Sequence, residues 1–382
     1  MSSRTVDVVA LGPAPLDPYD PAASAWALAA AFAAGGDDVR VLRPEGPAAA
    51  PLPPGVATVE VPLPLRRPGA AVDQAGFAAA AGQRIRRTVD LVVRDPSGLG
   101  ALGAPGRTPG HPPLVAFVRS VELQAFDREH RALSRRGWSD RLDAWRDRRS
   151  VRRLEQAALA EADVLFADDD ALAPALAREY GVAGDRVRSA VPPVADLARP
   201  ASRAAARAAL EIPPDVPVVV APTPDSRAAS PVVDRARETF RRIRPLFPGA
   251  RLVVAGAIAP ADPGVISVPG REGPTFGAAL TAADVALFAG GQPAFDPLVI
   301  GAMRSGCAVA AVPSVRLPSP PEGALQYSAT DDLGDLASAL AELFADPALV
   351  REVVRQAALY AARYDPERIA RAVNDGVSGR RA

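Results

Sequence analysis

The chain has 382 residues, 48% hydrophobic and 23% charged, so it can bury more than one core and is not disordered throughout. Its 44 basic residues balance 44 acidic residues, which argues against a general nucleic-acid binder. A single cysteine, Cys307, excludes an internal disulfide, and the two histidines, His111 and His130, offer little for a zinc site, so we expect no metal.

Every cation in the chain is an arginine, because the sequence contains no lysine. The longest apolar run, residues 22–34, is shorter than the roughly 20 residues that a bilayer-spanning helix needs. The first ten residues lack the apolar core of a signal peptide. We therefore expect a cytoplasmic protein.

The first half of the chain alternates short apolar segments with helical ones. Strands are predicted at residues 6–11, 39–42, 56–62, 89–93, 114–118, 162–167 and 186–191. Helices are predicted at residues 22–34, 119–160 and 171–180, and residues 197–202 are predicted to form a linker. Strands that alternate with helices indicate βαβ units and a parallel sheet.

The second half repeats this alternation. Strands are predicted at residues 216–221, 251–255, 265–268, 285–288 and 308–312. Helices are predicted at residues 231–246, 275–282, 295–305, 331–344 and 347–364, the last with Asp346 as its N-cap and Pro347 at its first position. We predict an α/β protein with two doubly wound parallel-sheet domains that face each other across a cleft.

Two segments of the second half carry a family resemblance: Leu280-Thr-Ala-Ala-Asp-Val-Ala-Leu-Phe288 and Gly301-Ala-Met-Arg-Ser-Gly-Cys-Ala-Val-Ala310. With Ala162-Asp163-Val164 in the first half, they resemble GT-B glycosyltransferases of the family 4 type. The resemblance implies two Rossmann-like domains, at residues 1–198 (acceptor side) and 199–365 (nucleotide-sugar side), with residues 366–382 returning to the first. It also implies metal-independent sugar transfer from a nucleotide-diphosphate sugar, with no further cofactor.

The donor site of the family contains two glutamates, which contact the donor sugar and the ribose hydroxyls. Without a gap, their positions here hold Pro293 and Gly301, so both carboxylates are missing. Asp296 lies close by, where the family has a glycine.

The family also neutralises the diphosphate with an arginine and a lysine, at positions that hold Pro222 and Arg227 here. Arg227 either binds phosphate or is a solvated loop arginine. The glycine-rich turn of the family is replaced by residues 15–21, a Pro/Asp loop that either repels phosphate or only precedes a helix. The family's histidine is replaced by Arg119, and Arg304 is a further candidate cation.

Three other features have structural and functional interpretations. Asp168-Asp169-Asp170 could be a metal cluster but is more simply a helix N-cap, and Cys307 is expected to be structural. The arginine-rich segment from Arg128 to Arg153, which Glu155 flanks, is interpreted as a salt-bridged surface. The resemblance leaves a peripheral membrane contact open there.

Two hypotheses follow for function. The first is a sugar transferase with an altered donor site, in which Arg227, with Arg119 or Arg304, binds the diphosphate. The second is a non-catalytic member of the fold that acts as a partner of an active glycosyltransferase or as a binding module. The missing carboxylates favour the second hypothesis, and the fold lineage favours the first.

Overall fold

The computed structural model describes residues 3–10, 23–46, 50–62, 70–85, 88–94, 112–118, 121, 123–124, 138–167, 172–195, 199–223, 229–271, 274–290, 297–315 and 317–378. Two compact units divide the described chain. The first comprises the described residues up to Ala195 together with Pro366–Ser378, and the second comprises those from Arg199 to Asp365.

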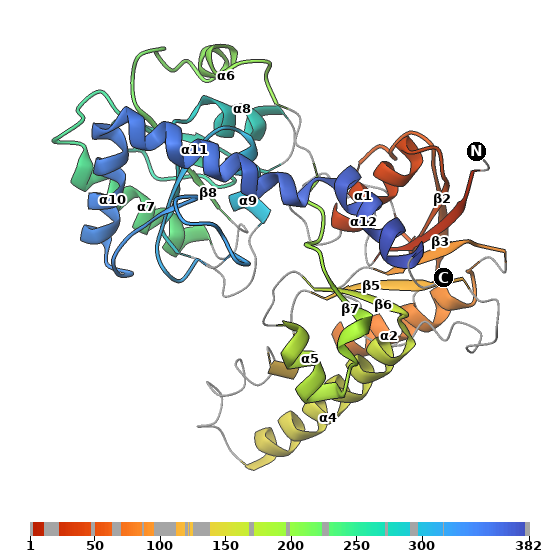
Figure 1. Cartoon of the computed structure of the whole chain (residues 1–382). Helices are drawn as coiled ribbons and strands as arrows, with labels where there is room; N and C mark the ends of the chain where they lie inside the picture. The colour runs from red at the N-terminus through yellow and green to blue at the C-terminus, as the bar shows by residue number, and fades with distance from the viewer. Residues whose placement is uncertain are drawn as a thin grey trace. The chain divides into compact units, whose positions relative to one another are not determined.

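The first unit contains a parallel sheet of seven strands in the order β3-β2-β1-β4-β5-β6-β7 (Figure 1). The strands are β1 (Thr5–Val9), β2 (Asp38–Pro44), β3 (Val56–Val61), β4 (Leu91–Arg94), β5 (Leu114–Val118), β6 (Val164–Ala167) and β7 (Val187–Ser189). The described helices of this unit are α1 (Ala23–Ala34), α2 (Ala70–Gly82), α4 (Trp138–Glu161), α5 (Leu172–Tyr180), the 3₁₀ helix η1 (Gly184–Arg186) and α12 (Pro366–Ser378).

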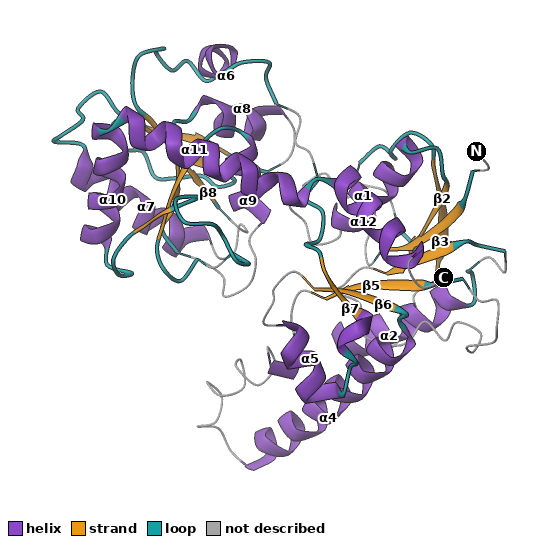
Figure 2. Ribbon diagram, viewed as in Figure 1, coloured by secondary structure: helices purple, strands orange, loops and turns teal. Residues whose placement is uncertain are grey.

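The second unit contains a parallel sheet of six strands in the order β10-β9-β8-β11-β12-β13. The strands are β8 (Val218–Pro222), β9 (Arg251–Ala255), β10 (Val265–Val268), β11 (Val285–Phe288), β12 (Ala308–Ala311) and β13 (Gln326–Tyr327). Its described helices, purple in Figure 2, are α6 (Arg203–Ala209), α7 (Ala229–Ile243), α8 (Pro274–Ala282), α9 (Pro297–Arg304), α10 (Leu333–Ala345), α11 (Pro347–Ala361) and the 3₁₀ helix η2 (Ala362–Tyr364). These two sheets confirm the predicted fold class.

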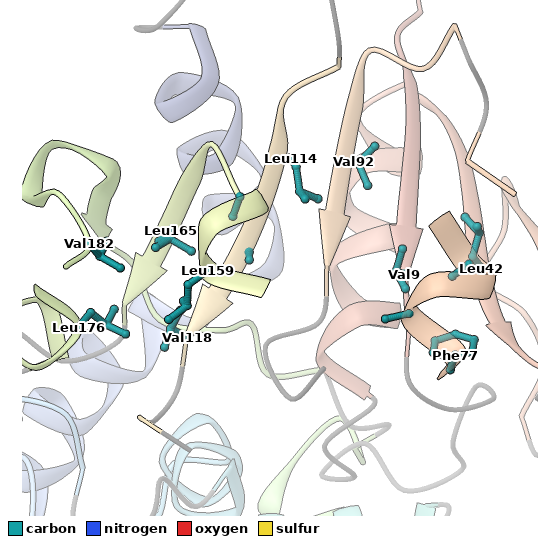
Figure 3. Close-up of a cluster of buried hydrophobic side chains, with 14 of the residues drawn as sticks. Val9, Leu42, Phe77, Val92, Leu114, Val118, Leu159, Leu165, Leu176 and Val182 are labelled. Carbon is teal, nitrogen blue, oxygen red and sulfur yellow. The ribbon is translucent and has the colours of Figure 1, made fainter. Parts of the chain in front are cut away.

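The central strands are buried along their whole length, as expected for parallel strands with helices on both faces. In the first unit, one face of the sheet packs on α2, α4 and α5 through a cluster of aliphatic side chains and one phenylalanine (Figure 3). The labelled members are Val9, Leu42, Phe77, Val92, Leu114, Val118, Leu159, Leu165, Leu176 and Val182.

Three aspartates hold the amino edges of the sheets in the same way. Each directly precedes a strand, and its carboxylate accepts a hydrogen bond from the first backbone N–H of the neighbouring strand. The donor–acceptor distance is 2.9 Å in all three pairs, Thr5–Asp90, Leu114–Asp163 and Val218–Asp284. In return, the aspartate N–H donates to the carbonyl of the same neighbour. The carboxylate thus satisfies an N–H at the end of the ladder.

Asp284 has two further partners from the α6 region. The buried Arg207 donates to its Oδ2 at 2.8 Å, and Arg203 donates to its Oδ1 at 3.0 Å. Arg207 also donates to the carbonyls of Ala282 and Pro214, so α6 is fixed to the amino edge of the sheet.

The C-terminal helix α12 packs on α1 in the first unit. Arg4 joins them, because its guanidinium donates to Asn374 of α12 at 2.9 Å and forms a two-bond ion pair with Asp37, which follows α1. Gly376 allows close approach to the sheet, since a Cβ there would lie 3.0 Å from the Phe166 ring.

One helix prediction is confirmed, and two helices were missed. The Asp346 cap is confirmed, since its carboxylate accepts hydrogen bonds from the N–H groups of Ala348 and Leu349. The second helix of the chain, α2, and the short α6 were not predicted. Both are rich in alanine, so their sequences contain little of the apolar–polar alternation that marks an amphipathic helix.

Candidate functional site

The carboxyl edge of each sheet is the place where a doubly wound fold binds ligands, at the point where the strand order reverses. In the first unit this point lies between β1 and β4, and in the second between β8 and β11. The chain leaves the sheet there toward the helix that follows each strand, so these connections hold the candidate residues.

In the second unit, the ends of β8 and β9 are tightly packed against each other. Thr223 follows β8 and is fully buried, and its backbone N–H and its hydroxyl both donate to the carbonyl of Ala255, at 2.8 and 3.0 Å. Gly256 follows β9 with a φ of +98°, and a Cβ there would lie 2.6 Å from Oγ1 of Thr223 and 3.0 Å from Cγ of Arg271. This edge therefore requires a glycine.

Two predicted site residues lie on α9 of the second unit. Gly301 is buried in the middle of the helix, and its carbonyl accepts from the N–H and hydroxyl of Ser305, at 3.0 and 2.8 Å. As a glycine, it contributes no side-chain group to a ligand. Arg304 is the last residue of α9, at the end of the helix that faces the amino edge, and its carbonyl accepts from Arg199. This position does not favour contact with a ligand at the carboxyl edge.

The other predicted site residues, Arg227, Arg119 and Asp296, lie outside the described residues, as does Pro293. In the sequence, Arg227 falls between β8 and α7, Arg119 directly follows β5, and Asp296 directly precedes α9. All three thus belong to connections that begin at carboxyl ends of strands. Asp168–Asp170, the Pro/Asp loop at residues 15–21, His111 and His130 also lie outside the described residues.

In the first unit, the structure adds two buried arginines that sequence reasoning missed. Arg43, near the end of β2, forms an ion pair with Glu60 (Nη2–Oε1, 2.5 Å) and donates to the carbonyl of Gly46 at 2.7 Å. Arg94 is the last residue of β4, with 5% of its surface exposed, beside the point where the strand order reverses. A charged residue that ends an otherwise apolar strand was the available signal.

Glu155, which flanks the arginine-rich segment, has a structural role of its own. Its side chain is buried on α4, where it accepts hydrogen bonds from the backbone N–H of Leu123, at 3.1 Å, and from the hydroxyl of Tyr180. Burial, and then this hydrogen bond, raise the pKa of Tyr180. Glu155 thereby ties α4 to the segment that follows β5, the strand before Arg119.

Cys307 is structural, as expected. It is fully buried between α9 and β12, and its Sγ donates to the carbonyl of Leu280 at 3.0 Å. Burial raises the pKa of the thiol to about 12, so the reactive thiolate does not form near neutral pH.

The described residues contain no cluster of three or more histidine, cysteine, aspartate or glutamate side chains that could hold a metal ion. None of the helices in the described ranges combines the length and the apolar character that a membrane crossing requires.

Sequence and structure comparisons place this architecture among known proteins. Residues 22–199 match the model of Glycosyltransferase Family 4. No curated protein matches the sequence at a significant level.

Solved structures match the fold over nearly the whole chain. Sucrose-phosphate synthase from Thermosynechococcus elongatus superposes with a TM-score of 0.68 at 18% identity, covering 97% of this chain and 98% of that one. WaaG, a glycosyltransferase involved in lipopolysaccharide biosynthesis, gives 0.65 at 18% identity, with 96% and 98% covered. HepE from Anabaena, in complex with UDP and glucose, gives 0.64 at 14% identity, with 99% and 100% covered.

At these identities the structural matches establish the fold, and the family model matches residues 22–199, just under half of the chain. Both agree with the resemblance carried by Asp163 and Asp284, which hold the amino edges of the two sheets. Residues 22–199 thus match the Glycosyltransferase Family 4 model, and the chain as a whole has the fold of GT-B glycosyltransferases.

Proposed function

We propose that this protein binds a nucleotide-diphosphate sugar at the carboxyl edge of the second sheet and transfers the sugar, without a metal, to an acceptor bound at the first. The observation that carries the proposal is the match over nearly the whole chain to HepE, whose structure contains UDP and glucose. The sheet order supports it, because the strand order reverses beside β8, where a nucleotide binds in doubly wound folds.

In this proposal, arginine side chains neutralise the charge of the diphosphate. Arg227 is assigned to the phosphates, because a guanidinium offers several N–H donors to two phosphate oxygens at once. Arg119 is assigned to the diphosphate as a second cation, and Asp296 to the donor sugar. Arg304 remains the alternative diphosphate contact, although α9 ends with it at the amino edge.

A second candidate function is favoured by Gly301. This residue lies in a buried, regular helix, at the position where the resemblance places a carboxylate, so the helix is present and its functional side chain is absent. In this alternative the protein does not catalyse transfer and acts as the partner of an active glycosyltransferase or as a binding module.

Calorimetric titration of the full chain with UDP, GDP and ADP, and with their glucose conjugates, tests the proposal. Each missing charged hydrogen bond costs about 1.5–3 kcal/mol, so we expect one nucleotide to bind with a dissociation constant weaker than about 10 μM. Release of free nucleotide from the conjugate over hours would support the transferase. Binding without turnover would support the alternative, and binding of no nucleotide would contradict the proposal.

Variants locate this site. Arg227→Ala should remove most of the nucleotide binding, whereas Arg355→Ala should leave it unchanged, because Arg355 is exposed on α11 and pairs with Glu352. The double substitution Gly301→Glu and Pro293→Glu should strengthen binding of the conjugate more than binding of the free nucleotide. If Arg227→Ala and Arg355→Ala change nucleotide binding equally, Arg227 is a solvated loop arginine and not a phosphate contact.

A further inference from the structure

Arg235 joins two connections at the carboxyl edge of the second sheet that are far apart in the sequence. It lies in the second turn of α7, the helix that follows β8. Its Nε donates to the carbonyl of Ala289 at 2.5 Å, and its Nη2 donates to the carbonyl of Asp331 at 2.6 Å. Ala289 directly follows β11, beside the point where the strand order reverses. Asp331 lies between β13 and α10, which packs on α7 (Figure 1).

The segment that contains Asp331 is held in place by hydrogen bonds of its own. The hydroxyl of the buried Ser328 donates to the carbonyl of Thr330 at 2.7 Å, and Asp332 is the N-cap of α10. The carboxylate of Asp331 accepts a hydrogen bond from the N–H of Ser314, beyond the end of β12, at 3.3 Å. Arg235 is therefore anchored to a segment with a fixed position.

The connection after β11 depends on Arg235 in turn. Ala289 is fully buried, so its carbonyl needs a hydrogen-bond partner, and Arg235 provides one. The next residue, Gly290, also lies against α7, because a Cβ there would be 3.8 Å from Cγ2 of Val232. Without the guanidinium, the carbonyl of Ala289 would have to turn toward water, and the start of this connection would move with it.

Arg235 differs from other arginines of α7 in its partners. Arg237, Arg241 and Arg242 all pair with carboxylates. Among the described residues, Arg235 forms no ion pair, and both of its acceptors are neutral carbonyls. A neutral donor could also satisfy a carbonyl, so these bonds do not explain why the residue is charged. A positive charge without a paired carboxylate at this edge favours a polyanion such as a diphosphate.

We propose that Arg235 is a positioning residue of the donor site. It holds the backbone of Ala289 and Gly290 in the form that binds a nucleotide diphosphate, and it adds positive charge to this edge of the sheet. The inference rests on the proposed function, and it adds a residue that the family resemblance does not predict. A connection that adopts the binding form for only a fraction of the time raises the apparent dissociation constant by the inverse of that fraction.

Hydrogen exchange and calorimetry on the full chain test the proposal. Arg235→Ala should raise the exchange rate of the backbone amides of residues 285–290. It should also weaken the binding of whichever of UDP, GDP and ADP the wild type prefers by about tenfold, which is the factor that one lost charged hydrogen bond supplies. Arg235→Lys keeps the charge but cannot hold both carbonyls with a planar fork, so it should recover part of the affinity.

Arg237→Ala is the matched control. Arg237 lies on the same helix, is likewise half-buried, and pairs with Asp262 in the connection from β9 to β10. Its replacement should lower the stability to urea but leave both the exchange at residues 285–290 and the nucleotide affinity unchanged. A merely structural role of Arg235 would give this same result for Arg235→Ala. Circular dichroism verifies folding, and Arg235→Gln provides the comparison if the alanine variant does not fold.

Three results would overturn the inference while leaving the proposed function intact. They are wild-type nucleotide affinity in Arg235→Ala, unchanged exchange at residues 285–290, and equal loss of affinity in Arg235→Ala and Arg237→Ala. A wild type that binds none of the three nucleotides would overturn the proposed function, and the inference with it.

Discussion

The amino and carboxyl edges of the two sheets differ in how their residues compare with the motifs of the family that the chain resembles. At the amino edges, Asp90, Asp163 and Asp284 make the same hydrogen bond with the neighbouring strand, and two of them belong to the motifs that carry the family resemblance. In the second unit, the resemblance predicts that a carboxylate position of the donor site is held by Gly301, in the middle of α9.

A resemblance in sequence can reflect a shared fold or a shared chemistry, and the two edges distinguish these cases. An Ala-Asp-Val segment resembles the family because the carboxylate closes a strand ladder, so it reports the fold. The donor-site positions would report the chemistry, and their change remains a prediction from the resemblance. A GT-B protein can therefore be identified from its amino edges while its reaction remains a proposal.

The largest expected effect is at Asp284. Asp284→Ala should destabilise the protein by about 3–5 kcal/mol, because it leaves the buried Arg207 without its carboxylate and the N–H of Val218 without an acceptor. Urea unfolding followed by circular dichroism measures the change. Asp234→Ala removes an exposed carboxylate 3.8 Å from Arg237 and should cost less than about 1 kcal/mol. Equal costs would show that the amino-edge carboxylate is dispensable.

The carboxyl edge is tested at Gly256. Gly256→Ala should cost about 2–4 kcal/mol, because the new Cβ meets Oγ1 of Thr223 at 2.6 Å and the backbone has a φ of +98°. Gly270→Ala is the matched control, since its φ is +79° and nothing lies within 4 Å of the added atom, so it should cost only about 1 kcal/mol. If the two variants unfold at the same urea concentration, packing between β8 and β9 is looser than described.

A smaller effect is expected at Asp163. Asp163→Ala should cost about 1–2 kcal/mol, because the N–H of the buried Leu114 loses its acceptor at 2.9 Å. Asp163→Asn keeps an oxygen at the same position and should recover most of this stability in the same unfolding measurement. An asparagine variant as unstable as the alanine variant would mean that charge, and not the hydrogen bond, matters at this edge.

The strands other than β13 were predictable because burial on both faces leaves continuous apolar segments that end at Gly, Pro or a charge. Four of them, β5, β9, β10 and β11, have the predicted bounds. The helices α2 and α6 could not be predicted in this way, since alanine is compatible with every environment and gives no periodicity.

The candidate site was less predictable than the fold. Arg227, Arg119 and Asp296 came from the resemblance and remain predictions, as they lie outside the described residues. Arg94 was missed because its place at the end of an apolar strand is a weak signal, which does not distinguish a solvated arginine from one that is 5% exposed. The burial of a residue depends on which strands become neighbours, and the order of the strands cannot be predicted from a local segment of sequence.

A pH-dependent effect, absent below pH 9, is expected at Cys307, which precedes β12 at the amino edge of the second sheet. Its pKa is raised from 9.0 to about 12 by burial, so above pH 9 the thiol ionises in the unfolded chain but stays protonated in the folded one. The unfolded state then binds fewer protons, and stability should fall by up to about 1.4 kcal/mol per pH unit from pH 9 toward pH 12. Urea unfolding of the wild type and of Cys307→Ala at pH 8, 9, 10 and 11 isolates this contribution. The difference in stability between the two proteins should stay constant below pH 9 and change in favour of Cys307→Ala above it. A difference that is independent of pH over this range would mean that water reaches the thiol, and that the amino edge is less closely packed than its hydrogen bonds indicate.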